Sequence, residues 1–177
     1  MINMLSVREI QQEDIDLIIA YWLESDRAFM EGMGVDMDKM PSRKEWNDML
    51  QAQLRTPFDK KKSYAMIWLY DNKPIGHCNI NKIVWQQEAH MHLHLWNKDV
   101  RQQGMGTELV NMTVPHFFEK FGLKTLYCEP YALNPAPNKT LAKAGFELVR
   151  TYTTIPGMLH FEQQVNLLQI SLEKQTL

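Results

Sequence analysis

The sequence predicts a mixed α/β or α+β domain, in which helices cover the faces of a sheet. Three observations predict this class. Apolar residues recur at helical spacing near the start of the chain and again over residues 104–121. Between them, two β-rich runs joined by the turn Asp71–Pro74 are typical of an antiparallel hairpin. Later in the chain a strand, a helix and two further strands are expected in succession, which favours a sheet packed against helices.

The first part of the chain predicts one strand and two helices. We expect a strand at Met4–Ile10 and a helix at Gln12–Leu23, whose apolar positions share one face. Residues 24–42 contain two glycines, a proline and four methionines, so we expect a long irregular segment there. A second helix is expected at Arg43–Leu54.

The middle of the chain predicts a meander followed by a long helix. Strands are expected at Tyr64–Tyr70, Ile75–Gln86 and Ala89–Trp96. A helix should follow at Gly104–Phe121, where apolar residues lie near one stripe. Because Pro115 lacks a backbone N–H, we expect it to kink this helix or to end it early.

The last part of the chain predicts three strands and a short helix. We expect a strand at Leu123–Cys128, a helix at Pro135–Ala144 stopped by Gly145, and strands at Phe146–Thr154 and Leu159–Leu172. The last strand could lie at a sheet edge and pair across a dimer, although pairing with Phe146–Thr154 is the expected use. Monomer and homodimer therefore both remain open.

Composition indicates a single domain whose small net charge produces no strong electrostatic potential at the surface. A chain of 177 residues with 45% hydrophobic composition fits one domain spanning residues 1–177. The net charge of −2 predicts no partnership with nucleic acid or an anionic membrane, and no apolar run approaches the roughly 20 residues that cross a bilayer. Cys78 and Cys128 lack metal-type spacing, and with no secretory leader before them they predict reduced thiols in the cytoplasm.

A glycine-rich loop predicts an anion site before the long helix. Gly104 and Gly106 lie between a strand and a helix, where unpaired N–H groups and the helix dipole favour a phosphate. A tight turn alone would also use glycine there. The pattern does not fit a dinucleotide site, because the third glycine of that motif would fall at Leu109, and it lacks the Gly-Lys-Ser/Thr of a P-loop.

Two motifs together resemble a known family. Arg101-Gln-Gln-Gly-Met-Gly106 resembles the Gln/Arg-x-x-Gly-x-Gly/Ala motif of the GNAT superfamily of acyl-CoA-dependent N-acetyltransferases. The segment Asn134–Phe146 is similar to that family's second signature, an Asn and a short helix ending in Lys-x-Gly-Phe. The order of elements matches over essentially the whole chain. The resemblance implies a mostly antiparallel sheet of about seven strands, splayed in the middle, with helices on both faces.

The resemblance also implies acetyl-CoA as co-substrate and a set of residues that hold it. Backbone N–H groups of the loop would cradle the diphosphate, the edge of the preceding strand would pair with the pantetheine, and Asn134 would anchor it from the other side. The strands that separate to admit it would be Ala89–Trp96 and Leu123–Cys128. The implied cofactor-binding residues are His94, Leu95, Trp96, Arg101, Gln102, Gln103, Gly104, Met105, Gly106, Thr107, Asn134, Lys139 and Lys143.

Three histidines form the most unusual chemical pattern in the chain. The alternation of a strand places His90, His92 and His94 on one face. A rise of about 3.3 Å per residue spreads them so far that a metal ion could take two neighbours but hardly all three, and no metal is expected. They could simply be a polar face lining a cleft. Alternatively, His92 is the general base that takes a proton from the attacking amine, with His94 and His90 as less favoured candidates.

This chain lacks a tyrosine that many members of the family use in the reaction, and its absence affects which branch of the family the chain resembles. Many GNAT enzymes place a Tyr where this chain has Leu141, to protonate the leaving thiolate, so Tyr127 and Tyr131 become candidates. This departure is similar to the branch that acetylates the N-termini of ribosomal proteins. His92 with Glu129-Pro130 is similar to siderophore-type acyltransferases instead.

We therefore expect an enzyme that transfers acetyl from acetyl-CoA to a primary amine of a peptide terminus or a small molecule. The alternatives are a siderophore-type or aminoglycoside-type acyltransferase, and a non-catalytic acyl-CoA sensor. Acidic residues in the segment that would shape the acceptor site favour a cationic acceptor; they are Glu24, Asp26, Glu31 and Asp36.

Overall fold

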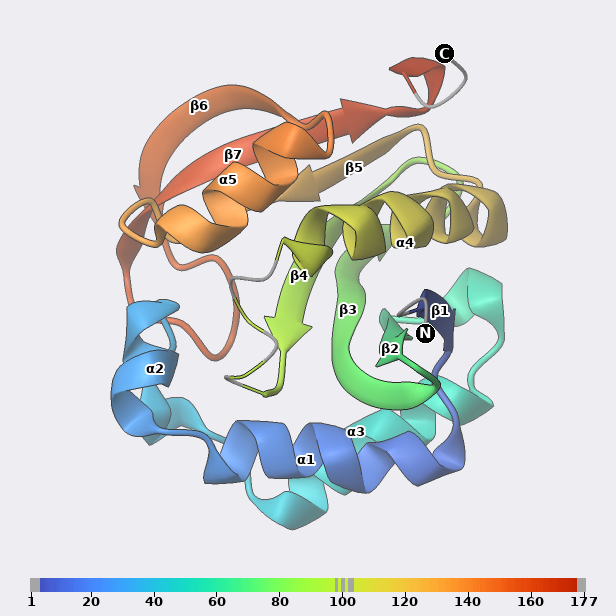
Figure 1. The fold of residues 1–177 in the computed structure, drawn as a ribbon, viewed down its shortest axis with the longest axis vertical. Helices are drawn as coiled ribbons and strands as arrows, with labels where there is room; N and C mark the ends of the chain where they lie inside the picture. Colours follow the sequence, from blue (N-terminus) through green and yellow to red (C-terminus); the bar gives the residue numbers. More distant parts are fainter. Residues whose placement is uncertain (1–3, 98, 100, 102–103, 175–177) are drawn as a thin grey trace.

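The fold is one seven-stranded sheet with helices on both of its faces (Figure 1). The computed structural model describes residues 4–174, except for residues 98, 100, 102 and 103. The strands are β1 (Leu5–Glu9), β2 (Ser63–Tyr70), β3 (Lys73–Val84), β4 (Glu88–Leu95), β5 (Thr125–Cys128), β6 (Glu147–Thr154) and β7 (Gln163–Ser171). The α-helices are α1 (Ile15–Glu24), α2 (Arg27–Gly32), α3 (Arg43–Arg55), α4 (Met105–Phe121) and α5 (Pro135–Lys143).

The sheet is antiparallel everywhere except at its centre. Its order is β1-β2-β3-β4-β5-β7-β6, and the one parallel neighbour pair is β4 with β5. That pair is short, because it extends only from Glu88 opposite Thr125 to His90 opposite Tyr127. Beyond His90 the two strands separate, as the family resemblance implies. The predicted fold class and the central splay are therefore confirmed.

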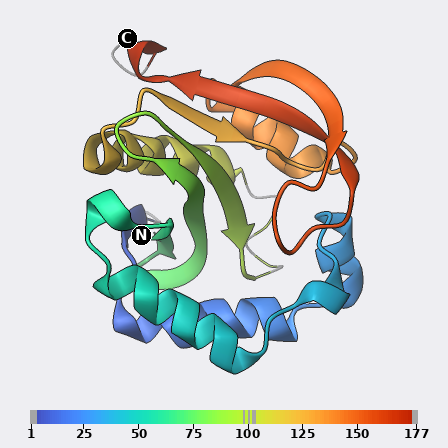
Figure 2. The same cartoon turned by 180° about the vertical axis from the view of Figure 1, so that it is seen from behind.

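Alternation along the strands divides the core into two clusters. Tyr64, Met66 and Trp68 of β2 belong to the cluster that includes the buried face of α4, whereas Ala65 and Ile67 belong to the cluster under α1 and α3. The two views agree that α1 and α3 run side by side on one side of the molecule while α4 and α5 lie on the other (Figures 1 and 2). Successive β2 residues thus face α4 on one side of the sheet and α1 and α3 on the other.

Helix α4 runs through Pro115 without ending there. It extends from Met105 to Phe121 and is closed by Gly122 in the left-handed conformation, with φ of 61°. The expectation that Pro115 ends the helix early is wrong, because α4 buries side chains on both sides of it, including Val114 and Phe118. Such burial outweighs the roughly 3 kcal/mol that an interior proline costs. Among the described residues, no helix is long and apolar enough to cross a membrane.

Two further expectations about elements need correction. Residues 24–42 are not wholly irregular, since α2 forms at Arg27–Gly32, where the Asp26 side chain accepts a hydrogen bond from the Phe29 N–H. The last strand begins at Gln163 rather than Leu159, because the chain before it turns toward the α2 side. There the Leu159 carbonyl accepts a hydrogen bond from the Asp36 N–H at 2.7 Å.

The C-terminal strand lies inside the sheet. Strand β7 pairs with β5 on one side and with β6 on the other, both antiparallel. The expected internal pairing with the strand before it is therefore confirmed, and β6 and β1 are the edge strands of the described sheet.

Candidate active site

A cleft opens where β4 and β5 separate. A cavity of about 70 Å³ lies there, lined by β4 residues, by Cys128 at the end of β5 and by the following loop and α5. The Cys128 thiol donates a hydrogen bond to the Met91 carbonyl at 2.9 Å, which closes the inner end of the gap. Burial raises the pKa of this thiol to about 12, and the Glu129 charge adds to the shift, so Cys128 is a neutral packing group rather than a nucleophile.

The backbone of β4 presents polar groups to this cleft. The Trp96 N–H donates across to the Ile75 carbonyl of the β3 side at 2.9 Å. Because residues alternate along an antiparallel ladder, Leu93 and Leu95 point their N–H and C=O groups the other way, toward the gap that β5 leaves unfilled. The edge beyond His90 is therefore available for an extended ligand.

Arg101 occupies part of that edge. Its guanidinium donates to the Leu95 carbonyl at 3.0 and 3.1 Å and to the Trp96 carbonyl at 3.2 Å, and it stacks on the Phe29 ring at 3.5 Å. Arg101 thus fixes the end of β4, a role that the motif alone does not reveal. Of the three predicted edge residues, Trp96 has its N–H and its C=O engaged, and His94 points its backbone groups toward β3. Leu93, which was not predicted, faces the gap.

The N-terminus of α4 follows this clamp. Gly104 is the N-cap, with φ of 77°, and no side chain caps the helix. The N–H groups of Met105, Gly106 and Thr107 occupy the first turn, where they have no partners within the helix. A Cβ at Gly106 would lie 3.3 Å from Thr140 of α5, so the bare backbone lets the two helices approach. Gln102 and Gln103, also predicted to hold the cofactor, fall outside the described residues.

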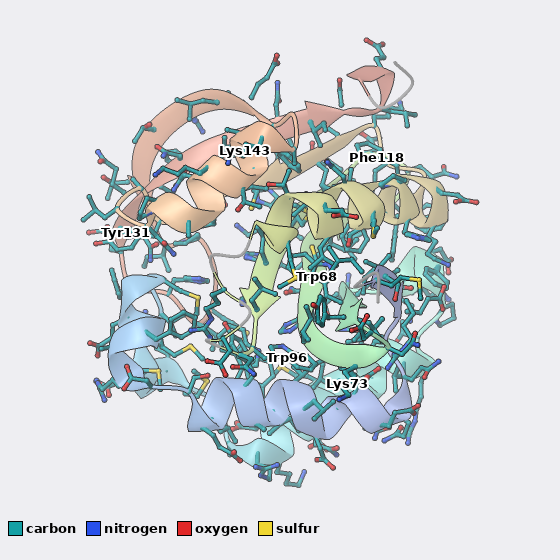
Figure 3. All side chains as sticks on the ribbon, in the orientation of Figure 1. Trp68, Lys73, Trp96, Phe118, Tyr131 and Lys143 are labelled. Atoms are coloured by element: carbon teal, nitrogen blue, oxygen red, sulfur yellow. The ribbon has the colours of Figure 1, made fainter. Side chains whose placement is uncertain are left out.

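Helix α5 supplies the opposite wall. Asn134 is its N-cap residue and lines the cleft, and the Asn138 amide holds the Asn134 carbonyl at 2.7 Å. Lys139 and Lys143 are both exposed on α5; Figure 3 labels Lys143 there. The structure thus brings Asn134 to the cleft and leaves the two lysines on the solvent side.

The three predicted histidines share the face of β4 that looks toward α1 and α3. In the register with β3, His94 lies opposite His77, His92 opposite Asn79, and His90 opposite Asn81. They do not share one environment, however. His92 and His94 line both the cleft cavity and a larger cavity on the side of α1 and α3. His90 lines neither cavity, and it lies 3.2 Å from the Glu129 carboxylate.

His94 belongs to a buried aromatic cluster. Its Nδ1 lies 3.1 Å from the Tyr21 hydroxyl, and its ring stacks on His77 at 4.6 Å between centroids. The Trp96 indole N–H donates to His77 Nδ1 at 2.7 Å, so that nitrogen is an acceptor and His77 is neutral. Burial, with a contribution from His92, lowers the pKa of His77 to about 3. Burial and the neighbouring His77 and His160 likewise hold the pKa of His94 well below its ordinary value.

His92 lies between the Asn81 amide and the His160 imidazole. Its Nε2 lies 3.1 Å from the Asn81 Oδ1, and its ring lies nearly parallel to that of His160 at 6.4 Å. Burial is the largest cause that lowers the pKa of His92 well below its ordinary value, and the surrounding imidazoles add to it. The ring is therefore neutral near pH 7 and can accept a proton.

A second, larger cavity lies beyond His92. It has a volume of about 280 Å³ and is enclosed by α1, α3, the β2–β4 face and the segment 157–160. Trp22 and Trp46 stack in one wall at 5.3 Å. The two cavities share Trp22, His92, His94 and His160, so these side chains stand at the junction between them.

Glu129 forms a separate polar cluster at the edge of the cleft. Its carboxylate contacts Lys82, His90 and the Tyr152 hydroxyl. Burial alone would raise its pKa, but these three partners outweigh that cost and lower the pKa to about 2. Glu129 is therefore an ionised carboxylate already held by its neighbours.

The position where many family members have a tyrosine is occupied here by Leu141, which packs in the core. Leu141 is 0% exposed and belongs to the cluster beneath α4 and α5, so no acid can act from that position. Of the two tyrosine candidates, Tyr131 lines the cleft, whereas Tyr127 lines neither cavity and contacts the His90 ring. Figure 3 shows Tyr131 in the loop between β5 and α5.

Several residues of the site were not predicted from the sequence. His77 could have been found from the hairpin, because it alternates in phase with Asn79 and Asn81, which come to share the face of the three histidines. His160 and Tyr21 carry no such signal, since only tertiary folding brings their segments to β4. Among the described residues, no three His, Cys, Asp or Glu side chains are grouped so that they could hold a metal ion.

Comparisons with known proteins agree with this geometry. The model of the acetyltransferase (GNAT) domain family matches residues 5–147. No curated protein sequence matches the chain significantly. Similar solved structures include a spermidine N-acetyltransferase from Vibrio cholerae with CoA and spermine, at 15% identity and a TM-score of 0.79, covering 98% of each chain.

Two other kinds of acetyltransferase have the same fold. RimL, a ribosomal L7/L12 α-N-protein acetyltransferase solved with CoA, is 13% identical with a TM-score of 0.78, covering 96% of this chain and 94% of its own. The aminoglycoside acetyltransferase AAC(6')-Ib, with CoA and kanamycin, is 16% identical with a TM-score of 0.72, covering 96% of each. At such identities the likeness shows the fold, and the family match over residues 5–147 shows that this chain belongs to the GNAT acetyltransferase domain family.

Proposed function

We propose that the protein transfers the acetyl group of acetyl-CoA to a neutral primary amine, with the donor in the cleft between β4 and β5 and the acceptor in the larger cavity. The observation that carries this proposal is the junction of the two cavities at His92, His94 and His160. A donor and an acceptor that enter from opposite sides would meet there.

The cleft fits the donor in three ways. The helix N-terminus at Gly104–Thr107 offers N–H groups to a diphosphate. The backbone polar groups of Leu93 and the Leu95 N–H can pair with the amides of pantetheine, because β5 has left that edge. Asn134 lines the other side. This assignment moves the pairing edge from the predicted Trp96 to Leu93, since Arg101 and Ile75 engage the Trp96 backbone.

Bound acetyl-CoA would supply the thioester that the amine attacks. The C–N bond forms as the C–S bond breaks, the nitrogen gives up one proton, and the sulfur leaves as a thiolate that takes one up. A β4 backbone N–H would stabilise the negative charge on the carbonyl oxygen. His92 would receive the proton from nitrogen, and Tyr131, which lines the cleft, is the candidate donor to sulfur. His94 contacts Tyr21 and His77, which suits it to hold the cavity wall in place.

The proton acceptor matters more for some amines than for others. At pH 7 an α-amine with a pKa of about 7.8 is roughly one-seventh neutral, whereas a lysine amine with a pKa of about 10.4 is neutral in roughly one molecule in 2,500. A neutral His92 beside an apolar cavity therefore suits an acceptor that arrives already deprotonated. Peptide termini and small amines of low pKa meet this requirement.

A non-catalytic acyl-CoA sensor is the second candidate, because Leu141 is buried where family members carry an acid. Turnover separates the two functions. An enzyme should release thiol from acetyl-CoA only when an amine is present, and acetyl-CoA should raise its melting temperature. A sensor would show the thermal shift without acceptor-dependent release, and the absence of both would exclude acetyl-CoA as its ligand.

The His92→Ala variant tests the proton route. It should lower kcat by about 10²- to 10⁴-fold, the usual contribution of a positioned base, while the KM for acetyl-CoA changes little. The matched control is His116→Ala, on α4 and outside both cavities, which should keep full activity. An unchanged kcat and pH–rate profile in His92→Ala would remove His92 from the mechanism.

We also propose a single domain, a cytoplasmic location and a small amine or peptide as the partner. The continuous sheet from β1 to β6 supports one domain over residues 1–177. Cys78 and Cys128 are both free thiols, which supports a cytoplasmic enzyme. A net charge of −2 supports a small amine or peptide partner over a nucleic acid.

A further inference from the structure

The acidic residues expected to attract a cationic acceptor are occupied elsewhere. Glu24 accepts from Arg43 at 3.2 Å and Glu31 from Arg27 at 2.7 Å. Asp26 and Asp36 cap short helical segments by accepting backbone N–H groups. Within the described residues, neither these four nor any other Asp or Glu side chain lines the larger cavity. The expectation of a cationic acceptor therefore loses its basis.

Apart from Lys62, the described lining of the cavity is apolar, aromatic or neutral and polar. Ile18 and Leu50 contribute aliphatic surface, and the stacked rings of Trp22 and Trp46 form a flat side. The polar floor consists of amides and imidazoles, and the imidazoles are held neutral by burial. Such a wall removes water from an apolar body and offers a second ammonium group no counter-charge.

The charged side chain that does line this cavity is positive. Lys62 is exposed and contributes to the lining next to Ser63. Its ammonium group would repel a cation that enters the cavity and attract a carboxylate. Among the described lining residues, the one Lys, Arg, Asp or Glu side chain thus has the sign that disfavours a polyamine or an aminoglycoside.

One buried donor in the wall lacks a partner among the described residues, namely the Trp46 indole N–H. Because buried donors are normally paired, this position favours a ligand that brings a carbonyl or carboxylate oxygen, toward which the indole would turn. At about 280 Å³ the cavity is also small, near the lower end of usual ligand pockets, and suits a single residue-sized body.

We propose that the acceptor is a primary amine on an apolar or aromatic body that carries a carboxylate or carbonyl group and no second cation. An α-amino acid and the N-terminal residue of a peptide share this chemistry. This inference rests on the proposed acetyl transfer and narrows it. It separates the protein from the polycation acetyltransferases of the same fold.

An acceptor panel tests the proposal. Acetyl-CoA-dependent thiol release should be measured with phenylalanine, phenylalaninamide and a dipeptide beginning with phenylalanine, and with spermine and kanamycin. We expect kcat/KM for the best aromatic acceptor to exceed that for either polycation by at least about 100-fold. Free amino acid and dipeptide are the arms that distinguish the two sources of this chemistry. A preference for spermine or kanamycin, or no release with any aromatic acceptor, would overturn the proposal.

Two variants test the structural reasons. Trp46→Phe keeps an aromatic ring, although a smaller one, and removes the N–H, so KM should rise about tenfold more for phenylalaninamide than for phenethylamine, which lacks the carbonyl and reports the loss of ring surface alone. Lys62→Glu should move the ratio of kcat/KM between spermine and phenylalanine about tenfold toward spermine. Lys60→Glu makes the same charge change outside the cavity and is the matched control.

Two sets of results distinguish a wrong acceptor class from a wrong reaction. If acetyl-CoA gives no thermal stabilisation and no thiol is released with any amine, the acetyl transfer itself is wrong and the inference falls with it. If acetyl-CoA stabilises the protein and polycations are acetylated best, the transfer stands and the acceptor class is wrong. The same conclusion follows if Trp46→Phe affects phenylalaninamide and phenethylamine equally and Lys62→Glu behaves as Lys60→Glu does.

Discussion

His92 Nε2 and Asn81 Oδ1 lie 3.1 Å apart on neighbouring strands of the sheet. A carbonyl oxygen can only accept, so the imidazole donates from Nε2 and its other nitrogen, Nδ1, carries the lone pair. Asn81 therefore decides which nitrogen of His92 can receive a proton. This pairing arises because β3 and β4 form a ladder in which both residues face α1 and α3.

Replacing Asn81 with Asp should raise the pKa of His92. A carboxylate at this distance stabilises the imidazolium by opposite charge, typically by one to three pKa units. The acid limb of the kcat/KM profile should move to higher pH by about one unit or more, and Asn81→Ser should leave it near the wild-type position. An acid limb that does not move, or that moves to lower pH, would show that Asn81 does not govern the titration of His92.

Bulk at Gly106 should weaken acetyl-CoA binding. A Cβ there would lie 3.3 Å from Thr140, so Gly106→Val must push α5 away or cover the N–H groups of the first turn. We expect the Kd for acetyl-CoA, measured by titration calorimetry, to rise at least about tenfold, or about 1.4 kcal/mol. Gly32→Ala is the control, since nothing lies within 4 Å of a Cβ at that position. Equal Kd values in both variants would argue against a diphosphate at α4.

Replacing Pro115 with Ala should stabilise the fold. Pro115 is exposed inside α4, where it removes one hydrogen bond and packs little. Alanine restores the donor, and part of the roughly 3 kcal/mol propensity difference should appear as about 1–2 kcal/mol of unfolding free energy. Urea denaturation measures the gain, and Asn111→Ala on the same helix should change it by only a few tenths. A loss of stability in Pro115→Ala would mean that Pro115 contributes contacts that its exposure does not suggest.

The buried histidines should lower the free energy of unfolding as the pH falls. The folded protein keeps His77 neutral down to a pKa of about 3, whereas the unfolded chain binds a proton below about pH 6.5. The unfolded state therefore binds more protons between these values, and the unfolding free energy should fall as pH falls through this window, by up to about 1.4 kcal/mol per unit from His77. Above about pH 7 this contribution is fully present and constant. His77→Gln should show a shallower slope in denaturation series between about pH 5 and pH 7, and an identical slope would contradict a neutral buried His77.

Much of the fold could be predicted because local patterns decided it. Alternation and the turn Asp71–Pro74 defined the β2–β3 hairpin, and the glycines at residues 122 and 145 marked helix ends correctly. Pro115 misled the prediction because a local rule on proline was outweighed by tertiary burial. Helix α2 was missed because its six residues are held by an Asp26 cap and by contacts distant in the chain, such as Asp36 with Leu159.

The site could be predicted only where sequence neighbours are also spatial neighbours. Alternation along one strand was enough to place His92 and His94 together, and the glycine loop was enough to locate α4. The separation of His90 from the cavities follows from Glu129, which is distant in sequence. Arg101 was predicted to bind the cofactor, and the structure adds that its guanidinium holds the Leu95 and Trp96 carbonyls at the end of β4, a contact that the motif does not indicate.

A crystal structure with a nonhydrolysable acetyl-CoA analogue would show whether donor and acceptor meet at His92. We expect the diphosphate on the N–H groups of Gly104–Thr107, pantetheine amides paired with Leu93, and the acyl group at the junction of the two cavities beside His92. A diphosphate bound elsewhere, or an acyl group turned away from His92, would rule out this arrangement.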